Sequence, residues 1–217
     1  MRGRDIGRFR SMYADLHMIC TFPSKNYDID DYPSIKKHLL SFGIERLEQT
    51  GATHVVNGEK IKSRKKTNNK WFETQDSISY WDDFNKQKIV WARLSRISKH
   101  DFYDFPRFAI VPEGFVTLDS LCFFTGERLN DLVSFLNSRY AAYYFFNTVA
   151  ILDNGGMQMR QQYVENIPLP NIQISQGASE TEIDELIFEA FHFTKEETTY
   201  IKSFLEMKKK EIEESRG

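Results

Sequence analysis

Four short runs between residues 88 and 125 decide the expected fold: KIVWARL (88–94), RFAIV (107–111), FVTL (115–118) and CFFT (122–125). Each run is rich in β-branched and aromatic residues, and turn residues separate one run from the next. This composition is typical of short strands. The four runs together therefore predict a meander of β-strands.

Helical patterns follow this strand region. Apolar residues in 128–146 return at the spacing of one helical face, which predicts a single helix there. Ser179 with Glu182, and Thr194 with Glu197, each form the pattern of a capping box, so two more helices are expected near the C-terminus. We therefore expect an α+β fold, with a mixed or antiparallel sheet, packed helices and a C-terminal helical arm.

The first half of the chain contains further expected elements. Residues 12–22 are mostly apolar and end at Pro23, which predicts at least one strand. Pro33 suits a first helical position, and the apolar spacing after it predicts a helix over 33–48. Farther along, the sequence Asp-Asn-Gly-Gly at 153–156 predicts a tight turn.

A change of composition near residue 171 predicts a domain boundary. The run IPLP (167–170) closes the first part, and Gly177 and Ser179 then mark a linker. We expect one domain over residues 1–171 and a helical segment over residues 172–217. That segment carries an apolar stripe, which we expect to pack against another domain or subunit.

Composition restricts the class of protein. The 217 residues are 41% apolar, enough for a sizeable core, and no apolar run reaches the about 18 residues of a membrane-spanning helix. Cys20 and Cys122 lie in apolar surroundings, typical of reduced cysteines in a cytoplasmic protein, although the sequence leaves a disulfide between them open. No membrane partner is expected.

Charge is unevenly distributed along the chain. Residues 1–110 hold 20 Lys and Arg against 14 Asp and Glu, whereas residues 111–217 hold 9 against 17. A basic half beside an acidic half is the pattern of a protein with one face toward DNA. The alternative is that the acidic C-terminal helices are simply solvated.

The basic segment EKIKSRKKTNNK (59–70) has no apolar period, so we expect an exposed loop or hairpin tip. Lysine and arginine neutralise phosphates, whereas asparagine and arginine form paired hydrogen bonds to base edges in the major groove. The alternatives are a solvated lysine loop and, for the two N-terminal arginines, packing of their stems. The candidate DNA contacts are Arg4, Arg8, Lys62, Arg64, Lys65, Lys66, Asn68, Asn69, Lys70, Arg93 and Arg96.

Patterns that indicate catalysis are largely missing from the sequence. It contains no phosphate-binding loop, no nucleophile elbow and no dinucleotide-binding glycine motif, and its five histidines have no metal-ligand spacing. Glu206 and Lys208 have the spacing of some nuclease pairs, but they lie in a charged helix whose face is better read as solvated. We expect no catalytic residue, cofactor or metal ion in this chain.

Several segments, taken in order, resemble the TaqI-like C-terminal target-recognition domain of type IIG restriction–modification enzymes, which are adenine-specific DNA methyltransferases. The layout is also similar to half of a type I specificity subunit. The matching segments are GRDIGRF (3–9), YPSIKKHLLSF (32–42), KWFETQ (70–75), KIVWARLS (88–95), LNSRYAAYYF (136–145), GGMQMR (155–160), NIPLP (166–170) and EIDELIFEAFHFTKEE (182–197).

The resemblance implies a module that recognises a short double-stranded DNA sequence and presents it to a methyltransferase domain. That domain would bind S-adenosylmethionine, flip an adenine out of the stack and methylate it, and a nuclease domain can accompany it. The methyltransferase signature Asn/Asp-Pro-Pro-Tyr/Phe is missing here, so the catalytic domains are expected elsewhere in the polypeptide or complex. We expect residues 1–171 to be the recognition domain. The helix over 128–146 and the turn at GGMQMR are expected to be scaffold, because the small residues of LNS suit tight packing and the paired glycines suit a positive-φ turn.

Three other functions stay open on the sequence alone. The chain is an intact nuclease or methyltransferase if this polypeptide alone shows turnover. It is a protein-interaction module working through its acidic helices if it binds a protein partner and no DNA. It is a binder of single strands or RNA if its tryptophans (Trp71, Trp81 and Trp91) stack on unpaired bases.

Overall fold

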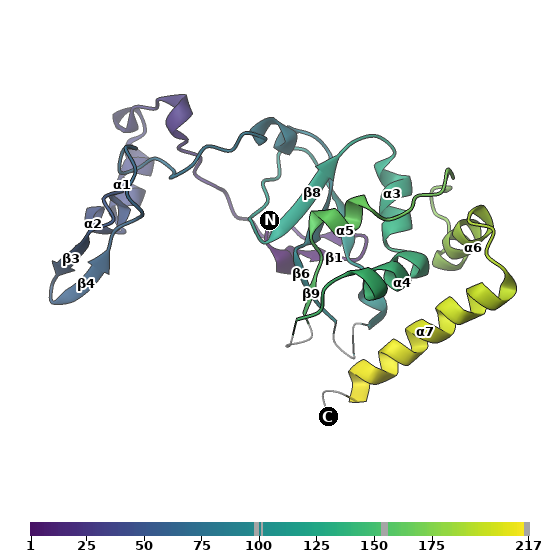
Figure 1. Cartoon of the computed structure of the whole chain (residues 1–217). Coiled ribbons are helices and arrows are strands. Elements are labelled where there is room, and N and C mark those ends of the chain that lie inside the picture. The colour runs from purple at the N-terminus through teal and green to yellow at the C-terminus, as the bar shows by residue number, and fades with distance from the viewer. Residues whose placement is uncertain (98–99, 101, 153–155, 215–217) are drawn as a thin grey trace. The chain divides into compact units, whose positions relative to one another are not determined.

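The computed structural model describes residues 1–97, 100, 102–152 and 156–214, which form two compact units (Figure 1). Unit 1 comprises Met1–Leu16 and Asp82–Gly217, and unit 2 comprises His17–Trp81. Unit 2 is therefore inserted into the chain of unit 1. The boundary expected after residue 171 falls within unit 1 and stays a prediction.

The centre of unit 1 is a three-stranded antiparallel sheet with the strand order β7-β5-β8. Trp91 lies opposite Phe108 on one neighbouring strand and Cys122 on the other. Three of the four predicted strand runs are confirmed. Their bounds are β5 Lys88–Ala92, β7 Phe108–Val111 and β8 Leu121–Thr125.

Both faces of this sheet are covered. Successive side chains of a strand point to opposite faces, so Ile89 and Trp91 join a large apolar cluster that includes the helices, while Val90 joins a smaller cluster with Ile6. A strand buried on both faces needs apolar residues at successive positions. That requirement explains the uninterrupted apolar run of β5.

Two antiparallel strand pairs complete the strands of unit 1. β1 (Ile6–Gly7) pairs with β2 (Arg10–Ser11), and β6 (Leu94–Arg96) pairs with β9 (Gly156–Gln158). The turn predicted at 153–156 falls on residues outside the described part of the chain, apart from Gly156, which begins β9.

Two strand predictions are wrong. At 115–118, Leu118 donates its N–H to the carbonyl of Met1 at 3.1 Å, and the carbonyl of Val116 accepts from the Met1 amino group. The segment thus bonds to one terminal residue and forms no strand, and a turn from Leu118 to Leu121 follows it. Residues 12–22 contain no strand because no neighbouring strand pairs with them. Met12 and Leu16 in that segment are exposed.

The single helix predicted over 128–146 is two helices, α3 (Leu129–Leu136) and α4 (Arg139–Thr148). Asn137 (1% exposed) leaves the helix because its side-chain amide bonds both backbone groups of Phe108, at 2.9 and 3.0 Å. Ser138 then caps the next helix by accepting the N–H of Ala141. A buried amide that pairs with β7 therefore divides the predicted helix.

The two C-terminal helices are confirmed as α6 (Glu180–Ala190) and α7 (Lys195–Glu214). Ser179 and Glu182 form the expected capping box, and Thr194 and Glu197 exchange the same hydrogen bonds. The apolar residues of both helices lie in the large cluster with α3 and α4. The stripe expected to contact a partner is thus largely buried within unit 1. A short helix, α5 (Gln161–Glu165), was not predicted.

Unit 2 contains α1 (Pro33–Leu40), α2 (Ile44–Leu47) and the antiparallel hairpin β3 (Thr53–Val56) with β4 (Glu59–Lys62). The predicted single helix over 33–48 is wrong because Gly43 adopts a φ of +87°, which breaks the helix between α1 and α2. Short 3-10 helices occur at Gly3–Asp5, Pro23–Lys25, Ile29–Asp31, Trp81–Asn85 and Phe102–Asp104.

The α+β fold is confirmed, and its described strand pairings are all antiparallel. Cys20 and Cys122 are free and half-buried, so no disulfide joins them. No helix in the described part of the chain is long and apolar enough to cross a membrane.

Candidate nucleic-acid interface

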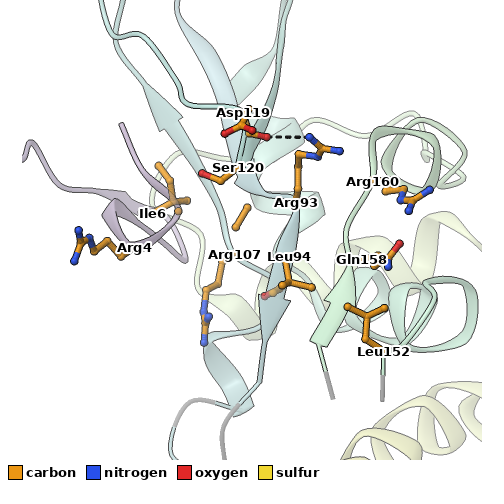
Figure 2. Close-up of a pocket in the computed structure, with 13 residues that line it drawn as sticks. Arg4, Ile6, Arg93, Leu94, Arg107, Asp119, Ser120, Leu152, Gln158 and Arg160 are labelled. Carbon is orange, nitrogen blue, oxygen red and sulfur yellow. Dashed lines mark hydrogen bonds between the residues drawn. The ribbon is translucent and has the colours of Figure 1, made fainter. Parts of the chain in front are cut away.

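Unit 1 contains a cleft of about 600 Å³ that is lined by four arginines. Figure 2 shows Arg4, Arg93, Arg107 and Arg160 around it. They come from four separate segments: the N-terminal turn, the β5–β6 junction, the residue before β7 and the residue after β9. The pairing of β6 with β9 brings the last of these segments beside the sheet.

Local hydrogen bonds fix two of these arginines. Arg93 lies between β5 and β6, where its side chain donates to the carbonyl of Asp119 at 3.0 Å. Arg107 donates from Nε to the carboxylate of Asp104 at 2.9 Å and from Nη1 to the carbonyl of Arg96 at 3.3 Å. Both guanidinium groups keep nitrogens that can bind a ligand.

The other two arginines are exposed and uncommitted. The guanidinium groups of Arg4 and Arg160 have no hydrogen-bond or ion-pair partner in the described part of the chain. Arg4 is held through its backbone by the turn around it, where Arg2 pairs with the buried carboxylate of Asp5. The hydrogen bond from Arg2 lowers the pKa of Asp5, which stays charged at neutral pH.

The rest of the cleft lining is mixed. Ile6, Leu94 and Leu152 provide apolar surface, and Gln158 provides a side-chain amide. Among the described residues of the lining, Asp119 is the single acid. The cleft therefore combines excess positive charge with apolar area.

Unit 2 presents a second basic surface, the loop over residues 63–75, which contains neither helix nor strand. Arg64 holds its interior: Nε donates to the carbonyl of Leu47 at 2.7 Å, and the terminal nitrogens donate to the carbonyls of Trp71 and Glu73. Burial lowers the pKa of Arg64 from its ordinary value. These three hydrogen bonds join both ends of the loop to the end of α2.

A buried amide braces the loop from the inside. Gln49, 4% exposed, donates from Nε2 to the carbonyls of Lys70 and Glu73 at 3.0 and 2.8 Å. Its Oε1 accepts the hydroxyl of Thr67 at 2.6 Å. Every polar atom of the Gln49 amide thus has a partner in the loop, as buried polar groups require.

Asn69 belongs to the same network. Its Nδ2 donates to the carbonyls of Thr74 and Gln75, both at 3.0 Å. The neighbouring N–H of Lys70 donates to the buried carboxylate of Glu73 at 2.7 Å. The two amide hydrogens of Asn69 are therefore committed to holding the loop.

The outer surface of unit 2 carries the remaining candidates. Lys62, Lys65, Lys66 and Asn68 are exposed, and their side chains have no partner within the described residues. Lys70 is exposed as well, but its ammonium donates to the carbonyl of Tyr27 at 3.3 Å and lies over a phenylalanine ring. Hydrogen bonds on the inner side fasten the loop and leave its outer side chains free for a ligand.

The remaining predicted residues lie in unit 1. Arg8 is enclosed, because its guanidinium pairs with the carboxylate of Glu180 and donates to the carbonyl of Asn137 at 2.7 Å. Arg96 is exposed on β6 and does not line the cleft. Of the eleven candidates, the cleft brings together Arg4 and Arg93, and unit 2 brings together the seven from Lys62 to Lys70.

Arg107, Arg160 and Gln158 line the cleft although the sequence does not predict a role for them in binding. The sequence places Arg160 in the expected scaffold segment GGMQMR and Arg107 at the start of an expected strand. No local pattern signals their convergence, because it depends on how β6 pairs with β9. Trp91 is 1% exposed and bonds the carbonyl of Met159, so it cannot stack on a base.

A scan against protein-family models and a search of curated proteins found no match to this chain. The function proposed below therefore rests on the residues and their geometry, together with the resemblance of the short segments. Within the described residues, no group of three or more histidines, cysteines and acids is gathered in a way that would hold a metal ion.

Proposed function

We propose that this chain is the sequence-specific duplex-DNA recognition module of a restriction–modification enzyme. The observation that carries the proposal is the fastened loop of unit 2, which holds its backbone from the inside and exposes Lys65, Lys66 and Asn68. Lysines bind phosphates, and an asparagine amide forms paired hydrogen bonds with adenine in the major groove.

The fixed backbone of this loop favours sequence-specific recognition over non-specific electrostatic attraction to DNA. Ordering a flexible loop on binding costs conformational entropy, about 1–2 kcal/mol per residue. A loop whose backbone is already held by Arg64, Gln49 and Asn69 avoids most of that loss, and it fixes the backbone from which the Asn68 side chain extends. A solvated lysine tail would lack such interior bonding.

In this proposal, the chain recognises the DNA sequence, and a partner domain carries out the methylation. That domain would be an adenine-specific DNA methyltransferase that binds S-adenosylmethionine, in the same polypeptide or complex, with or without a nuclease. The resemblance to type IIG recognition domains supports this arrangement. The chain itself would supply no catalytic residue.

The experiment is selection of bound duplexes from a randomised pool by the full chain, followed by a salt titration of binding to the enriched sequence. We expect one enriched motif whose affinity falls steeply with salt. In Lys65→Ala/Lys66→Ala, the slope of log affinity against log salt should decrease by about 1.8, since each phosphate contact contributes about 0.9.

Lys25→Ala/Lys37→Ala is the matched control, because it removes two exposed lysines of unit 2 outside the loop. Its slope should equal that of the wild type. Absence of any enriched motif, both with this chain and with the full enzyme from which the module comes, would contradict the proposal. An equal loss of slope in the two double variants would show general charge attraction instead.

A further inference from the structure

The cleft of unit 1 holds more positive charge than its own residues neutralise. Four arginines and one acid, Asp119, are among the described residues that line it. Like charges repel, so gathering them is favourable when an anion occupies the space between them. An anion is therefore the ligand class that this cleft fits.

The charges of two of the arginines, Arg4 and Arg160, do not stabilise the fold through an ion pair or a hydrogen bond within the described residues. Arg107 is paired with Asp104, and Arg93 is bonded to a carbonyl, but the exposed guanidinium groups of Arg4 and Arg160 have no partner within the described residues. Guanidinium groups match phosphate oxygens with paired, charge-assisted hydrogen bonds. These two arginines are positioned to bind phosphate oxygens.

The size and lining of the cleft favour an extended anion. Its volume of about 600 Å³ exceeds the room that a single phosphate needs, and its arginines come from four separate segments around the rim. A DNA strand carries a phosphate about every 3.4 Å along the helix axis, so several would face such a rim. The apolar side chains of Ile6, Leu94 and Leu152 suit the sugar carbons of the strand.

We propose that the unit 1 cleft binds the sugar–phosphate backbone of a nucleic-acid strand, through Arg4, Arg93, Arg107 and Arg160. The described lining contains four arginines and one side-chain amide, that of Gln158. The contacts are therefore mainly to phosphate, and they contribute affinity with little preference for particular bases. The inference rests on the proposed function for the identity of the strand, which belongs to the duplex that the unit 2 loop reads.

The test compares Arg4→Ala/Arg160→Ala with the wild-type full chain on a short duplex of random sequence. The slope of log affinity against log salt should decrease by about 1.8, and affinity near 0.1 M salt should fall roughly 10- to 100-fold. The motif enriched from a randomised pool should stay unchanged. Both side chains are exposed and unpartnered, so the thermal midpoint should not move.

Arg10→Ala/Lys195→Ala is the matched control, since it removes two exposed charges of unit 1 that do not line the cleft. An unchanged slope in Arg4→Ala/Arg160→Ala, or an equal loss in the control, would overturn the proposal. So would a wild-type chain that binds no duplex at low salt. A dinucleotide titration separates the remaining source of phosphate. Binding that the wild type shows and the variant loses, with an unchanged duplex slope, would make this a small-anion site and overturn the strand assignment.

The outcome also separates this inference from the proposed function. A reduced slope in Arg4→Ala/Arg160→Ala, with no motif enriched by either the chain or the full enzyme, supports the cleft and contradicts sequence reading. An enriched motif together with an unchanged salt slope in Arg4→Ala/Arg160→Ala supports sequence reading and contradicts strand binding by the cleft.

Discussion

The two units keep their functional residues in place by different means. In unit 1, an apolar cluster around Trp91 and Phe108 joins the sheet to the helices α3 to α7, and the cleft arginines extend from that body. In unit 2, the loop over 63–75 is held by side-chain hydrogen bonds to backbone carbonyls. An irregular segment is thus ordered without regular secondary structure, and lysine-rich composition alone does not make a loop flexible.

The largest expected effect is a loss of stability in unit 1, and it tests whether the two units are stabilised separately. Trp91→Ala removes the largest fully buried side chain and its hydrogen bond to Met159, which should destabilise unit 1 by about 3–5 kcal/mol. Amide hydrogen exchange should report lost protection across β5, β7 and β8, with protection retained in the β3–β4 hairpin. Equal loss in both units would contradict their separate stabilisation.

Arg64→Ala tests the corresponding claim for unit 2. It leaves the carbonyls of Leu47 and Trp71 without their donor, whereas the carbonyl of Glu73 keeps the hydrogen bond from Gln49. A lost buried partner costs about 1–3 kcal/mol. Arg64→Lys should recover only part of the loss, because an ammonium lacks the planar fork. Exchange protection of the loop is the measurement. If Arg64→Ala leaves it intact, the loop does not depend on this residue.

The two neighbouring asparagines give a smaller and sharper contrast. Asn69→Ala removes two hydrogen bonds from a half-buried amide and should cost about 1–2 kcal/mol in chemical denaturation. Asn68→Ala should leave stability unchanged, because the Asn68 side chain is exposed and has no partner in the described structure. Equal stability of the two variants would remove Asn69 from the internal network.

The smallest effect concerns pH and a buried carboxyl group of unit 1. Burial raises the pKa of Asp184, although the backbone N–H of Arg139 and nearby positive charges oppose the rise. A raised folded-state pKa means that the native state binds the proton more tightly. The stability from this group is therefore present below its unfolded pKa, about 3.8, and is lost as pH rises through the folded value.

Asp184→Asn should remove that part of the pH dependence. The variant keeps an oxygen that can accept the N–H of Arg139. Denaturation curves across the acidic range should show a flatter profile for the variant than for the wild type. A variant profile that matches the wild type would show that Asp184 does not titrate differently on folding.

The fold was predictable where apolar pattern or capping chemistry is local. Residues close together in the sequence mark these elements: the apolar runs of β5, β7 and β8, and the capping boxes of α6 and α7. The division of the helix at Asn137 was not predictable, because that amide bonds a strand about 29 residues earlier in the chain. A distant partner, rather than a local propensity, ends the helix.

The candidate site was predictable in composition and not in arrangement. Lys65, Lys66 and Asn68 are exposed as expected, but Arg64, which is also basic, and Asn69, which is also an asparagine, face inward. Residue type does not reveal which of two adjacent asparagines bonds the backbone. The segments that carry the cleft arginines are brought together in part by strand pairing between residues over 60 positions apart, such as Leu94 and Gln158.

The most direct test of the central claim is pool selection with Asn68→Ala. If the unit 2 loop reads sequence through Asn68, the variant should enrich the wild-type motif except at one base pair, where discrimination should fall by about 1–3 kcal/mol. The slope of log affinity against log salt should stay the same. A motif unchanged at every position would contradict the claim that this loop reads sequence through Asn68.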